Sequence, residues 1–418
     1  MSAIPAGYKQ TDVGVIPEDW AAVQAGDIGR FRGGSGFPTK YQGATAGAYP
    51  FFKVSDMNNE GNEIFMRRAN NYVSEPLRKQ LGAAAFPSDS IVFAKVGAAV
   101  FLERKKVLAQ PSCLDNNMAA FVLDANRADY RFIHYNLLHT KLGDLVSTTA
   151  LPSLSSSVLS RIGLPLPPLP EQRVIAAALS DMDALLAKLD QFIAKKRDLK
   201  QAAMQQLLTG QTRLPGFSGE WEEKPVARFS AFVTKGATPT TYGFNWEDDG
   251  VVFLRSECVS ADGLDLTQSM FISEPAHAAL ARGEVRSGDI LITITGNVGR
   301  VVRLSPDFGF ANINQHIARI RVKDHDVSAA FVFHWLSQAS VRANYALITT
   351  GQAYPQISLK QVRETMVPLP SFAEQTAIAT VLSDMDAEFA ALEALRDKTR
   401  ALEQGMMQEL LTGRIRLI

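Results

Sequence analysis

The chain has 418 residues, more than the ~250–300 residues of a large single domain, so more than one domain is expected. Hydrophobic residues make up 46% of it and charged residues 21%, which is typical of folded domains and excludes a largely disordered chain. The 43 basic and 43 acidic residues leave no net charge. Charge alone therefore does not indicate nucleic-acid binding, for which a basic surface is the usual sign.

The two cysteines, Cys113 and Cys258, lie in no CxxC motif and have no histidine nearby. This pattern argues against disulfides and structural zinc and predicts a reducing, cytoplasmic setting. The opening residues MSAIPAGYKQTDVG lack the basic head and apolar run of a signal peptide. No stretch approaches the ~20 apolar residues of a membrane span.

An internal repeat organises the chain. Residues 171–214 recur without a gap at 374–417, with 24 of 44 positions identical, including LSDMDA and LLTG. Upstream the repeat is weaker, and DSIVFAKVG at 89–97 corresponds to GDILITITG at 288–296. A repeat of this kind predicts one structural plan used twice. The expected order is a globular unit at 1–167, a helical region at 168–214, a second globular unit at 215–369 and a second helical region at 370–418.

The first globular unit contains strand-like runs and one short helix, and the second repeats this pattern. Alternating or continuous apolar runs bounded by turn residues are typical of strands. The expected strands are Ser90–Val96, Ala119–Leu123, Val251–Leu254, Asp289–Thr295 and Ile317–Val322, and the expected short helices are at 129–142 and 328–346. Each unit is therefore predicted to be a mixed α/β domain, and the fold class to be α+β.

The regions at 168–214 and 370–418 are predicted to be long helices, because good helix formers dominate and no proline or glycine interrupts 171–214 before Gly210. Gly210 and Gly413 suit C-terminal caps. Apolar residues recur at a four–three spacing, which is typical of a coiled-coil seam. The seam positions are Ile175, Leu179, Met182, Leu186 and Leu189, and Ile378, Leu382, Met385, Phe389 and Leu392. Two such helices related by a pseudo-twofold axis are expected to form an antiparallel coiled coil.

Several of these segments resemble the specificity subunits of type I restriction-modification systems. The resemblance rests on GYKQTDVGVIPEDW at 7–20, on LPLPPLPEQRVIAAALSDMD and LPSFAEQTAIATVLSDMD, and on QQLLTG and QELLTG. It covers essentially the whole chain. It implies that each globular unit is a target recognition domain that reads one half of a bipartite double-stranded DNA site, and that the helices set the spacing between the halves.

The resemblance also implies partners. The helices would dock two modification (methyltransferase) subunits, and two restriction (motor-nuclease) subunits would join the complex. S-adenosylmethionine, ATP and magnesium would belong to those partners, with no cofactor in this chain. From the residues alone, a two-domain coiled-coil interaction scaffold without DNA specificity remains the alternative, because the net charge is zero.

Motifs for catalysis are absent from the sequence. The proline-rich stretches at 165–170 and 368–370 do not match the [N/D]PP[Y/F] loop of an adenine methyltransferase. No GxxxxGK[ST] loop occurs, and Lys40 is misplaced for one after the glycines at 33–36. The six histidines form no HxxxH pair, so no catalytic or metal site is predicted.

Residues that contact DNA are expected in polar loops that follow strands, because base edges pair with arginine, lysine, asparagine and glutamine, and phosphates with lysine, serine and threonine. In the first unit the candidates are Lys53, Ser55, Asn58, Asn59, Lys95, Arg104 and Lys105. In the second they are Arg255, Ser256, Thr293, Thr295, Asn297, Gln352 and Tyr354. Four further residues are expected either to contact DNA or to act as turn or capping residues: Asn116, Asn117, Gln315 and His316. The acidic pairs Asp181/Asp183 and Asp384/Asp386 suit either a partner contact or a solvated face.

Overall fold

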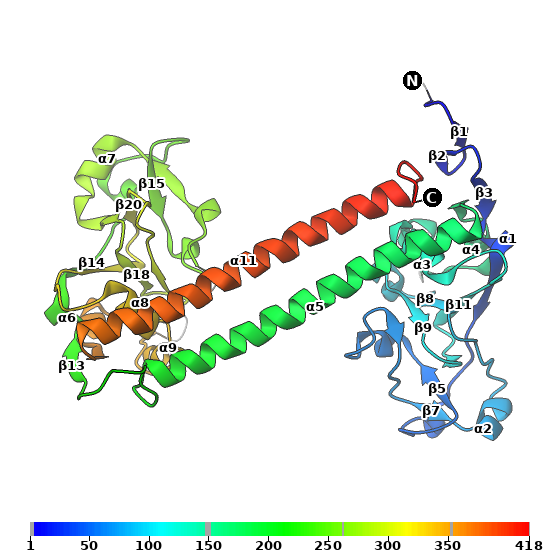
Figure 1. Cartoon of the computed structure of the whole chain (residues 1–418), viewed down its shortest axis with the longest axis horizontal. Coiled ribbons are helices and arrows are strands. Elements are labelled where there is room, and N and C mark those ends of the chain that lie inside the picture. The colour runs from blue at the N-terminus through cyan, green and yellow to red at the C-terminus, as the bar shows by residue number, and fades with distance from the viewer. Residues whose placement is uncertain (1–3, 147–151, 261–262, 352–353, 418) are drawn as a thin grey trace. The chain divides into compact units, whose positions relative to one another are not determined.

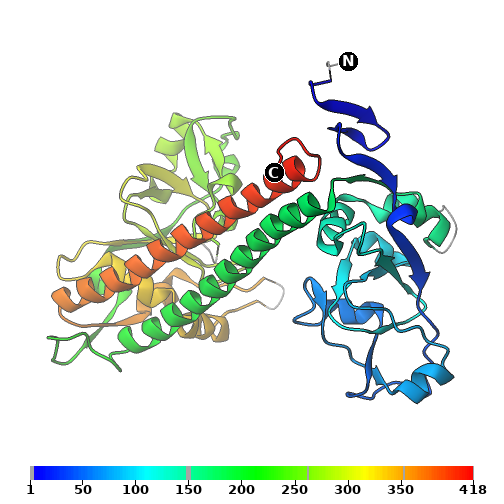
Figure 2. The same cartoon turned by 45° about the vertical axis from the view of Figure 1, so that its right-hand side comes forward.

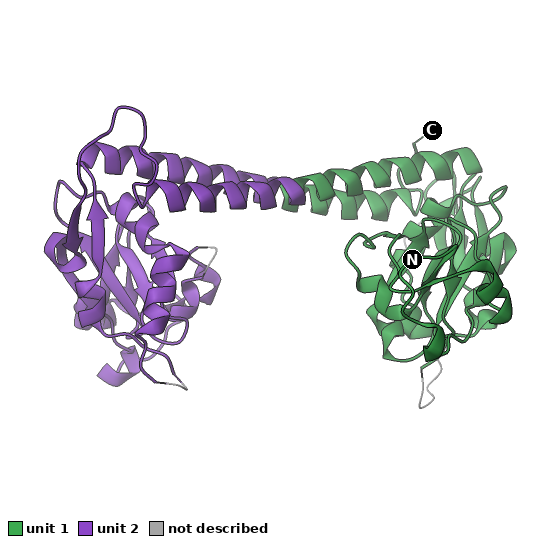
Figure 3. Ribbon diagram, turned by 90° about the horizontal axis from the view of Figure 1, so that it is seen from below, with its two compact units in different colours: residues 1–189, 396–418 green, residues 190–395 purple. Residues whose placement is uncertain are grey.

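The computed structural model describes residues 4–146, 152–260, 263–351 and 354–417. The chain folds into two compact units (Figure 3). Unit 1 consists of residues 1–189 and 396–418, and unit 2 of residues 190–395. Each unit therefore contains one globular part and one section of each long helix.

Unit 1 is built on a five-stranded sheet with the order β4-β11-β8-β9-β6 (Figure 1). A three-stranded sheet β10-β5-β7 and two strand pairs, β1-β2 and β12-β3, complete it. Its strands are β1 Tyr8–Thr11, β2 Gly14–Pro17, β3 Ala21–Gln24, β4 Gly29–Gly33, β5 Tyr49–Phe52, β6 Phe65–Met66, β7 Tyr72–Val73, β8 Ile91–Ala94, β9 Lys105–Leu108, β10 Cys113–Leu114, β11 Met118–Leu123 and β12 Gly163–Leu166. Its short helices are α1 Ala25–Ile28, α2 Glu75–Gln80, α3 Tyr130–His139 and α4 Ser156–Ser160.

Unit 2 repeats this plan with a four-stranded sheet β14-β21-β18-β19, a second sheet β16-β15-β20-β17, and the pair β13-β22. Its strands are β13 Glu222–Pro225, β14 Ser230–Lys235, β15 Val251–Leu254, β16 Met270–Ile272, β17 Glu284–Arg286, β18 Ile290–Thr293, β19 Val301–Arg303, β20 Phe310–Ile313, β21 Ile317–Val322 and β22 Met366–Leu369. Its short helices are α6 Val226–Phe229, α7 Glu274–Ala279, α8 Ala329–Leu336, α9 Ala339–Leu347 and α10 Leu359–Glu364.

The central strands match residue for residue. Phe121 of β11 lies opposite Ile91 of β8, and Ile320 of β21 lies opposite Ile290 of β18, so both pairs are offset by 199 residues. The five strands expected from the sequence are all present, with ends shifted by a residue or two, and the two short helical regions correspond to α3 and to α8 with α9. The α+β class and the internal repeat are confirmed.

The two long helices are α5, Leu169–Leu207, and α11, Phe372–Leu410. Gly210 and Gly413 follow them with φ values of 70° and 71°. This left-handed conformation favours glycine and ends the helices, as expected. Among the described residues, no helix is both long and apolar enough to cross a membrane.

Within each unit, sections of α5 and α11 pack side by side and antiparallel against the globular part (Figures 1 and 2). In unit 1 the first turns of α5, with Ile175 and Leu179, share a core with Leu410 of α11 and with Phe132 of α3. In unit 2 the first turns of α11 share the corresponding core with Leu208, directly after α5.

Burial along the seam depends on position. The four residues nearest the globular parts, Ile175, Leu179, Ile378 and Leu382, are fully buried. Farther along, Leu186 is still buried, whereas the others, Met182, Leu189, Met385, Phe389 and Leu392, are half-buried. Two helices alone cover only part of each other's apolar stripe, so the middle of the coil remains partly open to solvent.

The seam of α5 continues past Leu189 through Ile193 to Lys196 and Lys200, at the same four–three spacing. In unit 2 the two lysines pair across to α11, Lys196 with Glu388 at 2.6 Å and Lys200 with Asp386. Partner numbers fall as α5 numbers rise, as an antiparallel pair requires.

The second aspartate of each LSDMDA block contacts its own unit. Tyr135 of α3 donates a 2.5 Å hydrogen bond to Asp183. In unit 2, Asp386 pairs with Lys200 and lies 3.9 Å from His334 of α8. Asp183 and Asp386 therefore contact their own unit while half-buried, whereas Asp181 and Asp384 are exposed, so a partner contact or a solvated face stays a prediction for the pairs.

Candidate nucleic-acid interface

Several loops of unit 1 meet at one edge of its sheets, which we call loop edge 1: the ends of β4, β5 and β8 and the turn between β10 and β11. The backbone N–H of Asp115 in that turn donates to Phe52 O at 2.9 Å, and Lys95 N donates to Asn117 O at 2.8 Å. The β4 end passes so close that a Cβ on Gly34 would lie 2.0 Å from Asp115 O. Glycine is therefore required where these loops cross.

Unit 2 has the same arrangement, loop edge 2, at the ends of β14, β15 and β18 and the turn between β20 and β21. Asn314 N donates to Leu254 O at 3.1 Å, Ile294 N to His316 O at 2.8 Å, and Gly236 N to Asn314 O at 3.1 Å. The backbone of the two loop edges is thus shared, while the side chains differ.

One further loop reaches each edge from just before α4 or α10. Gly97 N donates to Pro152 O, and Gly296 N donates to Pro355 O, both at 2.8 Å. The second contact brings Tyr354, whose side chain is 68% exposed, beside the loop that follows β18. Gln352 lies outside the described residues.

At loop edge 1, the structure gathers the candidates that follow β5 and β8. Lys53 Nζ donates to Gln42 Oε1 at 3.2 Å and lies near Asp115. Burial raises the pKa of the Asp115 carboxyl, and Lys53 offsets this in part. The Lys95 ammonium lies beside Gly33, where a Cβ would be 2.4 Å from Nζ. Two lysine ammonium groups therefore lie in these loops.

The remaining unit 1 candidates differ in how exposed their side chains are and in whether other residues of the chain already bind them. Ser55 and Asn58 are exposed, and their side chains form no hydrogen bond within the described part of the chain. Asn59 is held by Arg68 O at 3.2 Å and the Asn70 side chain at 3.1 Å. Arg104 is half-buried.

At loop edge 2, Arg255 donates from Nε and Nη2 to Gln268 O at 3.2 and 3.0 Å. Ser256 donates to Glu257 Oε2 at 3.2 Å. Thr295 is half-buried and Asn297 is exposed, both directly after β18. Asn297 and Tyr354 are therefore the candidates most open to a ligand.

Two candidates must be corrected. Lys105 is 3% exposed, and its ammonium donates to Thr140 O at 2.8 Å and Glu103 Oε2 at 2.5 Å. Thr293 is fully buried; its hydroxyl donates to Asn297 O at 2.5 Å and accepts from Arg300 N at 3.0 Å. Both side chains hold loops together and are closed to DNA, because strand pairing turns them inward.

The turn residues have a clear role. Asp115 Oδ1 accepts from Asn117 N, and Asn314 Oδ1 accepts from His316 N, both at 3.0 Å. These are side-chain turns of the kind that aspartate and asparagine favour. In the sequence, this role is indicated by Asp115 and Asn314 themselves, which occupy the same position of the internal repeat. Gln315 projects from its turn and accepts from Thr238 Oγ1 at 2.7 Å.

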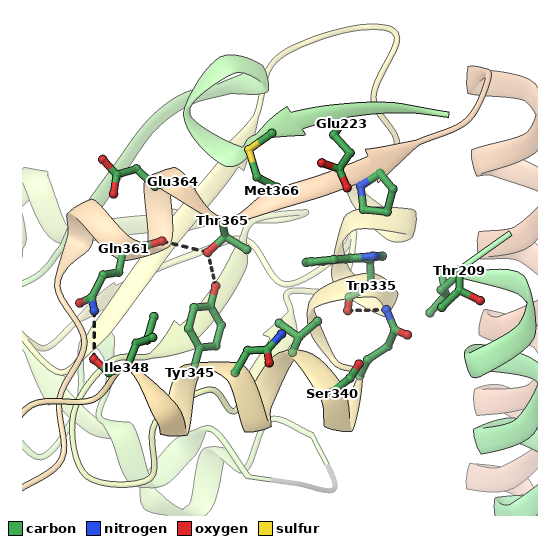
Figure 4. A pocket seen from close by; sticks show the side chains of 15 residues that line it. Thr209, Glu223, Trp335, Ser340, Tyr345, Ile348, Gln361, Glu364, Thr365 and Met366 are labelled. Atoms are coloured by element: carbon green, nitrogen blue, oxygen red, sulfur yellow. Dashed lines mark hydrogen bonds between the residues drawn. The ribbon is translucent and has the colours of Figure 1, made fainter. Parts of the chain in front are cut away.

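A cavity of about 690 Å³ lies elsewhere in unit 2, between α9, α10 and β22 (Figure 4). Its polar groups pair with one another, as Tyr345 OH does with Thr365 Oγ1 at 2.7 Å and Gln361 Nε2 with Ile348 O at 3.0 Å. Its only charged lining residues, of those described, are Glu223 and Glu364. Two carboxylates disfavour a phosphate backbone here, and none of the candidate DNA residues lines this cavity.

Comparisons with known proteins agree with this architecture. The family model described as "Type I restriction modification DNA specificity domain" matches residues 17–196 and again 221–403. The type I restriction enzyme EcoBI specificity subunit of Escherichia coli is 22% identical, over 96% of this chain and 86% of its own length. The MjaVIII specificity subunit of Methanocaldococcus jannaschii is 21% identical, over 96% of this chain and 94% of its own length.

Solved structures share the fold. The type I restriction-modification S subunit from M. genitalium superposes with a TM-score of 0.61 at 15% identity, covering 96% of this chain and 97% of its own. A chain from a study of assembly and conformational transition in the type I R-M system gives a TM-score of 0.57 at 16% identity, covering 96% and 99%. Because the family model matches both halves of the repeat, the chain belongs to the type I restriction-modification DNA specificity family.

Proposed function

We propose that this chain is the DNA sequence-recognition subunit of a type I restriction-modification complex, with each unit reading one half of a bipartite target. The observation that carries the proposal is the repeated loop edge. The same backbone hydrogen bonds hold Lys53 and Lys95 in unit 1, but Arg255 and the buried Ile294 at the matching places in unit 2. One scaffold with two sets of side chains suits two unlike half-sites.

A unit exchange tests this proposal. Residues 17–165 are replaced by the first unit of another family member, and the methylated adenines of cells that carry the whole operon are mapped. One half of the bipartite motif should change while the other half stays the same. Methylation with no bipartite consensus, or a change in both halves, would contradict it.

We further propose that α5 and α11 dock helices of the modification subunits and set the number of base pairs between the half-sites. Phe192 and Leu199 of α5 lie seven residues apart in unit 2, on one helix face, and are 44% and 49% exposed. Leu402 of α11, which corresponds to Leu199 in the repeat, is 57% exposed. A second apolar stripe at heptad spacing, outside the seam, suits an amphipathic partner helix.

The docking proposal is tested by a double substitution, F192S with L199S. Co-purification with the modification subunit should fall at least about tenfold, because two apolar anchors are lost. The matched control is L266S, since Leu266 is equally exposed, at 49%, but lies on a short turn of unit 2. Equal recovery of the double variant and the control would exclude this stripe as the docking surface.

In this proposal the chain supplies recognition and assembly, and the partners supply the chemistry. S-adenosylmethionine would bind the two modification subunits, and ATP and magnesium the two restriction subunits. The interaction scaffold without DNA specificity is the competing function. Specific duplex binding by the purified complex that weakens steeply with salt distinguishes the two, because only phosphate contacts release counterions.

A further inference from the structure

Unit 2 contains a pocket lined largely by arginine, beside the β14 end of loop edge 2. Its volume is about 340 Å³, and it lies where β14 and β21 face the short turn before β17 and β17 itself. Its charged lining residues are Arg282, Glu284, Arg286, Arg319 and Arg321. Four guanidinium groups thus surround one small space.

Arg319 forms the floor of the pocket. It is only 2% exposed, although arginine is rarely buried to this degree. Its Nη2 donates to Thr234 Oγ1 at 3.2 Å, and its guanidinium carbon lies 4.4 Å from the centre of the Phe232 ring. Its Nε is buried and has no hydrogen-bond partner among the described residues. A buried donor without a partner is unfavourable unless a ligand completes it.

The charges of the pocket are only partly balanced. Arg321 forms two 2.7 Å hydrogen bonds to Asp289, and Arg286 pairs with Glu284. Within the described ranges, no carboxylate pairs with Arg282 or with Arg319. The four arginines thus share two nearby carboxylates, Glu284 and Asp289, each of which forms its ion pair with another arginine.

The pKa of Arg319 reflects its burial first and the neighbouring positive charge second, while Asp289 and Glu284 oppose the shift in part. Burial, and then the charge of the neighbouring Arg321, lower the pKa of Arg319 to about 10. A lowered pKa means that the site disfavours the cation it holds. An anion in the pocket would stabilise it.

We infer that this pocket binds a phosphate group, through Arg282 at its rim and Arg319 at its floor. Guanidinium groups present planar pairs of N–H donors that match the oxygens of phosphate, and each keeps its charge at neutral pH. If the proposed function holds, the phosphate is a phosphodiester of the DNA backbone, held without regard to sequence. The alternative source of the same group is free phosphate or a nucleotide.

Unit 1 provides an internal comparison. The strand positions of Arg319 and Arg321 in β21 correspond to Ala120 and Val122 in β11, by the shared register of the central strands. Ala120 is buried in an apolar core there. The two arginines that β21 supplies to the pocket therefore have no counterpart in β11 of unit 1.

The test uses the full chain assembled with its modification subunits and measures duplex binding at several salt concentrations. R282A and R319M should each weaken binding about tenfold, on target and non-target duplexes alike, and lower the slope of log affinity against log salt by about one. R319K should keep part of the affinity. The matched control is R228A, because Arg228 is exposed in unit 2 and does not line the pocket.

Two further arms identify the source of the phosphate. Single neutral methylphosphonates are placed along the target duplex; one in the half-site of unit 2 should weaken the parent complex and leave R282A unaffected. Inorganic phosphate is titrated into the isolated full chain and into R282A. If DNA binding is unchanged but R282A loses phosphate binding, the source is free phosphate.

If neither DNA affinity nor phosphate binding changes in R282A and R319M, the inference is overturned. Because Arg282 is exposed, R282A separates a lost ligand from a folding defect. Failure of the proposed function would look different. The complex would then bind no DNA at all, while inorganic phosphate would still bind the parent chain and not R282A.

Discussion

The guanidinium group of Arg416 forms two hydrogen bonds, of 2.5 and 2.8 Å, to the carboxylate of Glu171. Glu171 lies in the first turn of α5, is 1% exposed and also accepts from Trp20 Nε1 at 3.0 Å. Unit 2 repeats the pair with Arg213 and Glu374, again through two hydrogen bonds, both of 2.5 Å. In each unit, the arginine after one long helix neutralises the buried carboxylate that begins the other.

We predict that R416A strongly destabilises unit 1. Removing one partner of a buried ion pair leaves an uncompensated charge, which costs about 3–5 kcal/mol. The free energy of unfolding should be measured by urea titration. The control is R414A, because Arg414 is exposed and forms its ion pair with the half-buried Glu409, at 3.2 Å. Equal unfolding midpoints for the two variants would show that the pair contributes nothing.

We predict that Glu403 makes unit 1 less stable as pH rises. Burial, followed by the neighbouring Asp183, raises the pKa of Glu403 from 4.5 to about 7, while Arg400 opposes this shift. Asp183 also accepts from Tyr135 OH. The folded state then holds a proton that the unfolded state releases, so stability falls between about pH 4.5 and 7 and stays low above.

Because Glu403 is partly exposed, solvent screening reduces this effect to the order of 1 kcal/mol. E403Q should lack this contribution, so the melting temperature of the parent relative to E403Q should be higher at pH 5 than at pH 8. E403K copies the Lys200–Asp386 pair of unit 2 and should stabilise the chain at pH 8. The prediction would be refuted if the parent and E403Q had the same melting temperature as each other at pH 5 and again at pH 8.

His334 is predicted to act in the opposite direction. Burial lowers the pKa of His334 from 6.5 to about 4, and the nearby Asp386 only partly offsets this. A group whose folded pKa is depressed contributes stability that is complete above pH 6.5 and lost as pH falls towards 4. H334Q should flatten the unfolding free energy over this range by about 2 kcal/mol. Unfolding free energies of the parent and H334Q that change equally from pH 6.5 to 4.5 would contradict it.

The seam of α5 is predicted to contribute more to stability than the exposed face of the same helix. Leu179 is fully buried, whereas Leu185 is 44% exposed. L179A should lower the free energy of unfolding by about 2–5 kcal/mol, because it leaves a cavity in the core of unit 1. L185A should change it by less than about 0.5 kcal/mol. If L179A and L185A lowered the free energy of unfolding by comparable amounts, the assignment of Leu179 to the buried seam would be wrong.

Much of the fold could be predicted because its signals are local. The four–three spacing predicted α5 and α11, and Gly210 marked the end of the first helix. The five expected strands are present, since short apolar runs bounded by turn residues favour strands whatever lies across from them.

The candidate site was harder to predict. Lys105 was a candidate because it lies in a cluster of basic residues, and Thr293 because it matches the Lys95 region of the repeat, but both are buried. Arg319 was missed because nothing in its own strand marks an arginine that faces another sheet. Whether a polar side chain meets solvent or a distant partner depends on strand pairing, which no short stretch of sequence encodes.

The sequence by itself determined the repeat, the two long helices, their seam and the turn residues that precede β11 and β21, because helix periodicity and turn preferences act over a few residues. Only the tertiary structure decided which polar groups are used internally. Arg416 and Glu171 are 245 residues apart, and Arg213 and Glu374 are 161 apart. Such pairs form only when the chain brings remote segments within hydrogen-bond distance, and burial then fixes their charge and their strength.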